Sequence, residues 1–416
     1  MSQVKGSYMR QEDFVKAVEG AGGTAYLVGG WVRDHLRGAE PQDKDFVITG
    51  LEREAFAELF PAASLIGHAF PVYLVEIDGV RSEVAFARRE RKAGHGYRGF
   101  AVDFGVEVTI EDDLFRRDTR INSMAYRLPA MELIDPYGGQ DDLAHRVIRA
   151  TSHHFSEDPV RALRAARQAA ELGFAIDEGT QVMMADCAAE LAEEPKERVM
   201  HELSRALAAP QPSFFFEALA HANLLESVFP EIFALKGKTQ PPQYHPEGDA
   251  YCHTMQIVDV VARETQTLEA RFAALVHDIG KGKTPEEMLP HHYGHEQRGL
   301  LVLDAWNVRM TLPKSWLMAA HFVIREHMRA PLLKKTGKIA DLLLAVKTAG
   351  LSFADFCCII RADHGILPQY LVRGEELSRK MMEVRGTKAP SGLRGADVGK
   401  WLHEARVRLL AQLLST

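Results

Sequence analysis

The chain has 416 residues, of which 46% are apolar and 26% charged, and its formal net charge at pH 7 is -7. This composition is that of a folded globular protein and excludes intrinsic disorder, and the length predicts about two to four domains at roughly 150 residues each. The negative charge excludes a protein that binds nucleic acid through its bulk field, so a contact with RNA needs a local basic face.

The four cysteines form no CxxC pair and indicate no disulfide framework, which favours a reducing compartment. The N-terminal residues lack the apolar run of a signal peptide, and no apolar stretch approaches the roughly 20 residues of a membrane span. These patterns predict a cytoplasmic protein without a membrane partner.

The first part of the chain shows the mixed periodicities of an α/β unit with a small sheet. The expected elements are a helix over 9–21, a buried strand over 24–30, a helix over 31–38, a strand over 43–50, a hairpin over 71–87 that turns at Asp78-Gly79, and a mobile loop over 88–100.

From about residue 141 the strand patterns fade, and residues 158–228 predict one helix after another. A proline-rich break over 238–248 precedes a second helical block over 249–351. The tail, 371–416, has nine Lys and Arg against five Asp and Glu. The predicted fold class is therefore α+β, with a small mixed sheet followed by helices only.

The most specific pattern is LVGGWVRDHLRG followed by DKDFVI. Two glycines after a strand let the backbone approach a ligand, and the next helix offers free N–H groups to phosphate. Asp43 and Asp45 are two apart on the expected strand and so face one side, where two carboxylates bridge divalent cations for an in-line displacement. Glu83 is a candidate third carboxylate from a later strand. Each pattern alone is common in ordinary turns and strand caps, but their conjunction favours function.

Two arginine-rich segments follow. In EDDLFRRDTRIN, Arg116 and Arg117 are candidates to bind a triphosphate with Asp118 orienting them, and the alternative is an exposed, charged helix start. In SEDPVRALRAAR, Asp158 before Pro159 is typical of a helix N-cap.

Three further arginines of the second segment, Arg161, Arg164 and Arg167, share one helix face. Such a stripe beside a nucleotide binds phosphate and a base edge. A solvated helix face is the common alternative.

The second half carries His253, the pair His277-Asp278 in ALVHDIGKGKTP, and Asp363. Imidazole and carboxylate together suit a divalent transition metal, which lowers the pKa of a bound water and aims it at a phosphate ester. Lys281 is placed to neutralise that phosphate. His292 and His295 either extend the site toward phosphate or belong to a polar loop.

In this order, the clusters resemble the class II tRNA nucleotidyltransferases, the CCA-adding enzymes of the DNA polymerase β superfamily, of the bacterial type with an HD phosphohydrolase domain. The resemblance covers nearly the whole chain. It implies that Gly30, Arg33 and Arg117 contact the nucleotide, that Asp43 and Asp45 hold Mg²⁺, and that Asp158 and Arg161 act as a protein template supported by Arg164 and Arg167. Segment 88–100 then corresponds to the family's flexible loop. Arg120 departs from the family, which commonly has threonine there.

For the second half, the resemblance implies His253, His277, Asp278 and Asp363 as ligands of nickel, manganese, cobalt or magnesium. The implied activities are phosphatase, 2′-nucleotidase and 2′,3′-cyclic phosphodiesterase. The implied domains are a nucleotidyltransferase head (1–140), a helical neck and body (141–237), an α-helical HD domain (238–370) and a helical tail (371–416).

The sequence thus predicts an enzyme that adds CCA to the 3′ end of tRNA from CTP and ATP, as a monomer or a homodimer. An enzyme that adds only the terminal A and a poly(A) polymerase are the nearest alternatives. The presence of a loop over 88–100 argues against a CC-only enzyme. A signalling HD hydrolase with an inactive head belongs to another class, and intact Asp43, Asp45 and Arg33 argue against it.

Overall fold

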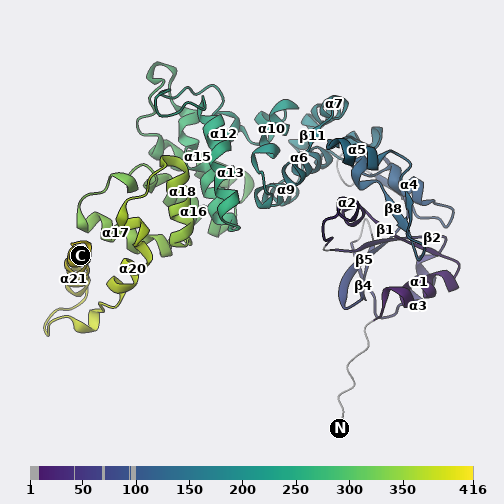
Figure 1. Ribbon diagram of the computed structural model, residues 1–416, viewed down its shortest axis with the longest axis horizontal. Coiled ribbons are helices and arrows are strands. Elements are labelled where there is room, and N and C mark those ends of the chain that lie inside the picture. The colour runs from purple at the N-terminus through teal and green to yellow at the C-terminus, as the bar shows by residue number, and fades with distance from the viewer. Residues whose placement is uncertain (1–8, 42, 68–70, 93, 95–99, 416) are drawn as a thin grey trace, which may run out of the picture. The chain divides into compact units, whose positions relative to one another are not determined.

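The computed structural model describes residues 9–41, 43–67, 71–92, 94 and 100–415 (Figure 1). The chain divides into two compact units. Unit 1 comprises Met1–Val199 and His221–Leu224, and unit 2 comprises Met200–Ala220 and Leu225–Thr416. The boundary falls inside the range 141–237 that the resemblance assigns to one neck and body.

Unit 1 is built on a seven-stranded sheet in the order β3-β4-β5-β2-β1-β8-β9. Its strands are β1 (Thr24–Val28), β2 (Asp45–Thr49), β3 (Ser64–Ile66), β4 (Val72–Ile77), β5 (Val80–Phe86), β8 (Ala125–Arg127) and β9 (Glu132–Ile134). Strands β2 and β5 are parallel and the other neighbours are antiparallel. The predicted mixed sheet is therefore confirmed.

Strands β1 and β2, at the centre of the sheet, are almost wholly apolar, because both faces of the sheet are covered. On one face, Phe14 of α1 (Gln11–Gly20) and Phe56 of α3 (Arg53–Leu59) pack with Phe46 and Phe86 of the sheet. The other face packs on Leu114 of α4 (Ile110–Phe115). This double packing fixes the relative position of β2, which begins at Asp45, and β5, which carries Glu83 at its middle.

The predicted hairpin is confirmed, since Asp78 and Gly79 both take the left-handed conformation, with φ of 53° and 76°, that a two-residue turn requires. The prediction of a mobile loop over 88–100 is wrong for its first part. There, β6 (Arg89–Lys92) pairs with β7 (Phe100–Asp103). Glu90 explains the strand, because it is buried and bound by arginines of the following segments. Residues 93 and 95–99 of this segment lie outside the described residues.

The rest of unit 1 is mostly helical, although the prediction of helices only is wrong at one short pair of strands. Its helices and turns are α2 (Gly30–Leu36), η1 (Arg120–Asn122), α5 (Gly139–His145), η2 (His153–Glu157), α6 (Val160–Leu172), α7 (Glu178–Asp186), α8 (Ala188–Leu191) and the start of α9 (Lys196–Ala208). Two short strands, β10 (Val147–Ile148) and β11 (Ala175–Ile176), pair beside them.

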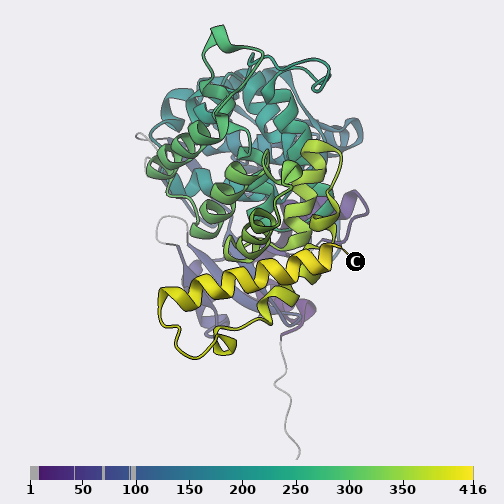
Figure 2. The same ribbon diagram turned by 90° about the vertical axis from the view of Figure 1, so that its left-hand side faces the viewer.

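Unit 2 contains only helices and turns among its described residues. They are α10 (Ser213–His221), α11 (Leu225–Val228), α12 (Pro230–Phe233), α13 (Ala250–Glu264), α14 (Leu268–Val276), η3 (Ile279–Lys283), η4 (Glu286–Met288), α15 (His295–Met310), α16 (Lys314–Glu326), η5 (Ala330–Leu332), α17 (Thr336–Thr348), α18 (Phe353–His364), α19 (Gln369–Val372), α20 (Gly374–Met382), η6 (Gly386–Lys388) and α21 (Ala396–Leu414). The predicted break over 238–248 lies between α12 and α13. Figure 2 shows α21 as one long helix.

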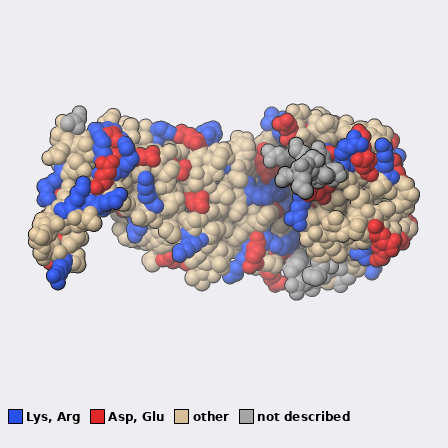
Figure 3. Space-filling model, turned by 90° about the horizontal axis from the view of Figure 1, so that it is seen from below, with Lys and Arg blue, Asp and Glu red and all other residues tan. Residues whose placement is uncertain are grey.

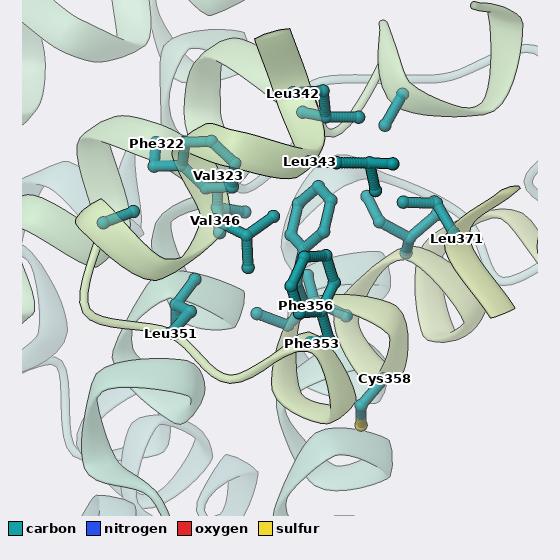
Figure 4. Close-up of a cluster of buried hydrophobic side chains, with 14 of the residues drawn as sticks. Phe322, Val323, Leu342, Leu343, Val346, Leu351, Phe353, Phe356, Cys358 and Leu371 are labelled. Carbon is teal, nitrogen blue, oxygen red and sulfur yellow. The ribbon is translucent and has the colours of Figure 1, made fainter. Parts of the chain in front are cut away.

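One apolar core joins the predicted HD domain to the predicted tail. The rings of Phe322 of α16 and Phe356 of α18 pack at an angle of 58° with centroids 5.1 Å apart, and Leu343 of α17 and Leu371 of α19 belong to the same cluster (Figure 4). Leu410 of α21 belongs to the same core. The tail helices therefore bury apolar surface against the helices that carry the metal-site residues.

No single helix in the described ranges has the length and apolar character to cross a bilayer, although α17 and α18, bent by 116° at their break, meet that criterion jointly by length and composition.

Candidate functional site

Three carboxylates come together where the start of β2 lies beside the middle of the parallel strand β5. Asp45 is the first residue of β2 and lies directly opposite Glu83 in register. Strand β2 begins at Asp45, so Asp43 lies two residues before it and outside the strand predicted over 43–50, but its charge still acts on the Asp45 carboxyl. We call Asp43, Asp45 and Glu83 the head carboxylates.

The head carboxylates repel one another. Burial of Asp45 and the charge of Glu83 raise the pKa of Asp45 to about 6, Arg117 opposes this shift, and Asp43 adds to it. A divalent cation relieves such repulsion, and oxygen donors are the ligands that Mg²⁺ prefers. The head carboxylates therefore fit a magnesium site.

The glycine turn gives the arginines room beside this site. Gly29, with φ of 68°, caps α2, and a Cβ there would lie 3.3 Å from the guanidinium of Arg117. Gly30 begins α2, and a Cβ there would lie 3.6 Å from Arg33. Of the two, Gly29 is the position that requires glycine, which the sequence analysis did not single out.

Arg33 links α2 to the segment after α4. Its guanidinium binds both oxygens of Asp34 at 2.9 and 2.8 Å, and its remaining terminal nitrogen donates to Asn122 at 3.0 Å. These bonds fix the plane of the guanidinium at the start of the helix. Neither Asp34 nor Asn122 was predicted.

Arg116 and Arg117 share one buried carboxylate, that of Asp113. Although burial alone would raise it, the two arginines hold the pKa of Asp113 at about 2. Arg116 is also bound to Glu90 at 2.9 Å, which makes it part of the scaffold. Arg117 lies close enough to Asp45 to shift the pKa of that carboxyl, so Arg117 is the member of the pair that reaches the site.

Asp118 does not orient these two arginines as predicted. It is buried, and it accepts hydrogen bonds from Arg164 at 2.8 Å and from Gln168 at 3.3 Å. Asp118 thus ties η1 to α6. Arg120 lies near Asp142 of α5. Burial raises the pKa of Asp142, and the charges of Arg149 and Arg120 oppose this shift.

The three arginines of α6 do not form a uniform exposed stripe. Arg161 is 7% exposed and donates to the carbonyl of His154 and to Glu90, and Arg167 is 4% exposed and pairs with Glu171. The Arg164 side chain is 42% exposed. The interpretation of a solvated face is therefore wrong for Arg161 and Arg167, whose side chains are buried, while contact of the three arginines with a nucleotide stays a prediction.

Asp158 has two partners. Its carboxylate accepts a hydrogen bond from the backbone N–H of Val160 at 3.2 Å, which confirms that it caps α6. The same carboxylate is bound by Arg198 of α9 at 3.0 and 2.8 Å. Arg198 was not predicted, and it holds Asp158 in one orientation.

In unit 2, the four predicted metal ligands come together; we call His253, His277, Asp278 and Asp363 the HD cluster. His253 lies on α13 and Asp363 on α18, while His277 ends α14 and Asp278 precedes η3, so the His-Asp pair spans a junction and not one helix. The Nε2 atom of His253 lies 3.2 Å from Asp363, and that of His277 lies 3.1 Å from Asp278.

The hydrogen bonds around the HD cluster orient its donor atoms as cation ligands. His277 donates its Nδ1 proton to the Ala274 carbonyl at 2.7 Å, and Nδ1 of His253 lies 2.6 Å from Glu247. These bonds leave both Nε2 lone pairs facing the carboxylates. Within the described residues, His277 Nε2 and both Asp278 oxygens are buried without a hydrogen bond of normal geometry. Buried imidazole and carboxylate donors of this kind fit a divalent transition metal.

A pocket of about 470 Å³ opens onto Asp363 and Lys281 and is lined by the exposed rings of Tyr244 and Tyr293. His292 lines it too, but both of its ring nitrogens are engaged, with the Thr284 hydroxyl and the Thr239 carbonyl, and burial lowers its pKa to about 4. His292 is therefore neutral and structurally held.

The alternative of a polar loop is wrong for His295, because it begins α15 and is buried with Nε2 3.2 Å from Asp278, while its contact with phosphate stays a prediction. His327, which was not predicted, is fully buried beside it. No sequence motif surrounds His327, and only the packing of α16 against α14 and α15 reveals it.

Three known protein families match successive parts of the chain. Residues 25–149 match a family described as poly A polymerase head domain, residues 173–235 one described as probable RNA and SrmB-binding site of polymerase A, and residues 250–347 one described as HD domain.

Two curated relatives are similar over nearly their whole length. A multifunctional CCA protein of Acinetobacter baylyi is 37% identical over 93% of this chain and 97% of its own. One of Nitrosococcus oceani is 37% identical over 94% of this chain and 98% of its own.

Three solved structures share the fold, each matching 95% of this chain. A Thermotoga maritima CCA-adding enzyme complexed with tRNA has a TM-score of 0.59, 20% identity and 89% of its own chain covered. A tRNA-processing enzyme with CTP has a TM-score of 0.60, 22% identity and 99% of its own chain covered. A CCA-adding enzyme with ATP has a TM-score of 0.61, 20% identity and 89% of its own chain covered.

Proposed function

The chain belongs to the multifunctional CCA proteins, which are tRNA nucleotidyltransferases with an HD domain, and from this membership we propose that it adds C, C and A to the 3′ end of tRNA. CTP and ATP are the substrates, pyrophosphate is released, and no nucleic-acid template is used. The observation that carries the proposal is the in-register placement of Asp45 opposite Glu83, with Asp43 and Arg117 beside them.

Asp43 and Asp45 would hold Mg²⁺, with Glu83 as the third carboxylate. Mg²⁺ held there would supply charge stabilisation for the attacking 3′-oxygen and the leaving pyrophosphate. Arg117, held by Asp113, and Arg33, held by Asp34 and Asn122, bind the triphosphate. The open turn at Gly29 and Gly30 admits the phosphates to the start of α2.

Asp158 and Arg161 select the base. Each presents a hydrogen-bonding edge in a fixed orientation. Asp158 is held by Arg198, and Arg161 is held by the His154 carbonyl and by Glu90. Arg164 and Arg167 support them from the same helix. Asp158 and Arg161 can select a base without a nucleic-acid template only if the hydrogen bonds that orient their side chains are kept.

In unit 2, the HD cluster holds a divalent transition metal and acts as a phosphatase, 2′-nucleotidase and 2′,3′-cyclic phosphodiesterase. A metal bound there lowers the pKa of a water to be used against a phosphate ester. Lys281 lies 2.5 Å from Asp278 and at the pocket floor, where its charge offsets that of the phosphate.

The acceptor RNA contacts the neck and body (141–237) and the tail (371–416), while the head (1–140) and the HD domain (238–370) carry the chemistry. The relatives' structures with tRNA, CTP and ATP support these partners. Lys and Arg side chains gather, with acids among them, at the end of unit 2 that carries α20 and α21 (Figure 3). This is a local basic surface on a chain of net charge -7.

The test is extension of tRNA that lacks its last three nucleotides, with Mg²⁺ and CTP, ATP or both. Growth by CC with CTP and completion to CCA with both nucleotides is expected. Extension only of tRNA that already ends in CC, by ATP alone, would make the chain an A-adding enzyme, and a long A ladder would make it a poly(A) polymerase. Either result would overturn the proposal.

A further inference from the structure

The pocket beside the HD cluster has two kinds of lining residue. Asp363 and Lys281 supply charge, and the rings of Tyr244, His291 and Tyr293 supply aromatic surface. Its volume of about 470 Å³ lies within the range of sites for small molecules, which is roughly 300–1,000 Å³. A single small ligand can therefore contact both kinds of residue.

The aromatic surface is open to solvent. Tyr293 and Tyr244 are 71% and 74% exposed. The ring of Tyr293 stacks on the exposed ring of His291, with centroids 5.4 Å apart and an angle of 20° between the planes. Because so much of Tyr293 is exposed, the face of its ring that is turned away from His291 is free to stack on a ligand.

The segment that carries these two rings is held from inside by the residue between them. The ring nitrogens of His292 lie 2.8 Å from the Thr284 hydroxyl and 3.0 Å from the Thr239 carbonyl. Arg298 of α15 donates to the Tyr293 carbonyl at 2.9 Å. The stacking surface is therefore organised before a ligand arrives, which lowers the entropy lost on binding.

One segment connects the rings to the charged part of the pocket. Thr239 binds His292, and the next residue, Gln240, accepts a hydrogen bond from the ammonium group of Lys281 at 2.6 Å. Tyr244 follows in the same segment. The aromatic rings and the group that offsets a phosphate charge are thus held by adjacent residues, within reach of one ligand.

A cationic phosphate site next to an open aromatic face has the two features that recognise a nucleotide, since every nucleobase stacks on such a face. We propose that this pocket binds a whole nucleotide, with its phosphate at Lys281 and the HD cluster and its base stacked on Tyr293, while Tyr244 supplies a second ring to the nucleoside. The proposal rests on the proposed HD function and names the residues that favour nucleotides over other phosphate esters. Stacking accepts every base, so the base can be any of the four.

The test measures hydrolysis of three phosphomonoesters by the full-length chain with Mn²⁺, Co²⁺ or Ni²⁺. They are adenosine 2′-monophosphate, a short RNA that ends in a 2′-phosphate, and glycerol 2-phosphate, which is also the ester of a secondary alcohol but has no base. The first two distinguish a free nucleotide from the end of an RNA as the source of the same chemical group.

Three variants separate the ring from its surroundings. Tyr293→Ala removes the stacking face, and Tyr293→Phe keeps the ring and removes only the hydroxyl. Leu301→Ala is the matched control, because Leu301 of α15 is also 71% exposed and lies outside the lining of this pocket. Nucleotide addition by each variant shows that the chain is folded.

Wild type, Tyr293→Phe and Leu301→Ala are expected to prefer nucleotide substrates to glycerol 2-phosphate by kcat/KM. Tyr293→Ala should raise KM by about tenfold for each nucleotide substrate that wild type hydrolyses, and leave KM for glycerol 2-phosphate unchanged.

An unchanged KM for nucleotides in Tyr293→Ala, or an equal loss with all three esters, would overturn base stacking and leave the HD function standing. A wild type that hydrolyses none of the three esters with any of the metals would overturn the proposed phosphatase activity itself.

Discussion

The head carboxylates and the HD cluster both gather acids, but their charges are balanced in different ways. In the head, burial and Glu83 raise the pKa of Asp45 to about 6, and the nearest arginine, Arg117, is already tied to Asp113. In unit 2, burial alone would raise the pKa of Asp278, yet Lys281 and His277 hold it well below its usual range. The protein therefore leaves the charge of the head carboxylates poorly balanced, whereas Asp278 has the ammonium group of Lys281 2.5 Å away.

The difference in donors has a consequence for the metals. The oxygen donors of the head carboxylates suit Mg²⁺, which keeps several waters and arrives with a nucleotide. Buried imidazoles, each held by a second hydrogen bond, suit a transition metal that stays bound. One chain would thus use a transient ion for nucleotidyl transfer and a resident ion for phosphate hydrolysis.

The largest expected effect separates the two sites. Asp45→Asn removes a charge that would bind Mg²⁺, and nucleotide addition should fall by about 10³-fold or more. Phosphohydrolase activity should stay within about twofold, since the HD cluster lies in the other unit. Asp141→Asn makes the same chemical change on an exposed side chain of α5 and should leave both activities intact. Loss of both activities in folded Asp45→Asn would refute the independence of the sites.

The reciprocal change is Asp278→Asn. Hydrolysis of a 2′,3′-cyclic nucleotide should fall by about 10²-fold or more, because the variant loses a carboxylate ligand, while extension of tRNA stays unchanged. Asp304→Asn, at an exposed position of α15, is the control. Full hydrolysis by Asp278→Asn would mean that the HD cluster is not the hydrolytic site.

The third prediction concerns the scaffold behind the head site. Asp113→Asn leaves the buried Arg116 and Arg117 without their shared carboxylate, so the free energy of unfolding of unit 1 should fall by about 3 kcal/mol or more. Urea denaturation followed by tryptophan fluorescence measures it. An unchanged midpoint would show that the arginines find other partners.

The same carboxylate sets a pH dependence. Its folded pKa of about 2 is below the unfolded value of 3.8, so its contribution is complete above the unfolded value and is lost as pH falls through the folded one. The stability difference between wild type and Asp113→Asn should be constant above about pH 5 and shrink by about 2 kcal/mol toward pH 2. A difference that stays constant down to pH 2 would contradict the depressed pKa.

The smallest expected effect distinguishes recognition from capping. Asp158→Ala should lower stability by about 1 kcal/mol through loss of the α6 cap and also relax the choice between CTP and ATP. Asp177→Ala is matched to it, because Asp177 caps α7 and also binds an arginine, Arg149. Equal loss of stability with unchanged nucleotide choice in both variants would reduce Asp158 to a structural residue.

Much of the fold and the metal residues could be predicted, because their signals are local. Short motifs contain the glycine turn that precedes Asp43 and Asp45, and also the His277-Asp278 pair. The Asp78-Gly79 dipeptide is typical of a hairpin turn, which the structure has. The parallel pairing of β2 with β5 that places Glu83 opposite Asp45 was only a conjecture from sequence.

What was missed depends on contacts between distant segments. Asp113, Glu90 and Arg198 look like ordinary surface charges in the sequence, yet each holds a predicted nucleotide-binding side chain. His327 lies 32 residues from His295 with no motif around it. The arginines of α6 look like one stripe, and only packing shows that Arg161 and Arg167 point into unit 1.

The contrast between a transient and a resident metal is tested most directly by metal analysis of the purified chain after long dialysis against buffer with Mg²⁺ and no chelator. Wild type and Asp45→Asn should retain the same amount of transition metal, and Asp278→Asn should retain none. Transition metal that is lost from Asp45→Asn, or kept by Asp278→Asn, would contradict the account.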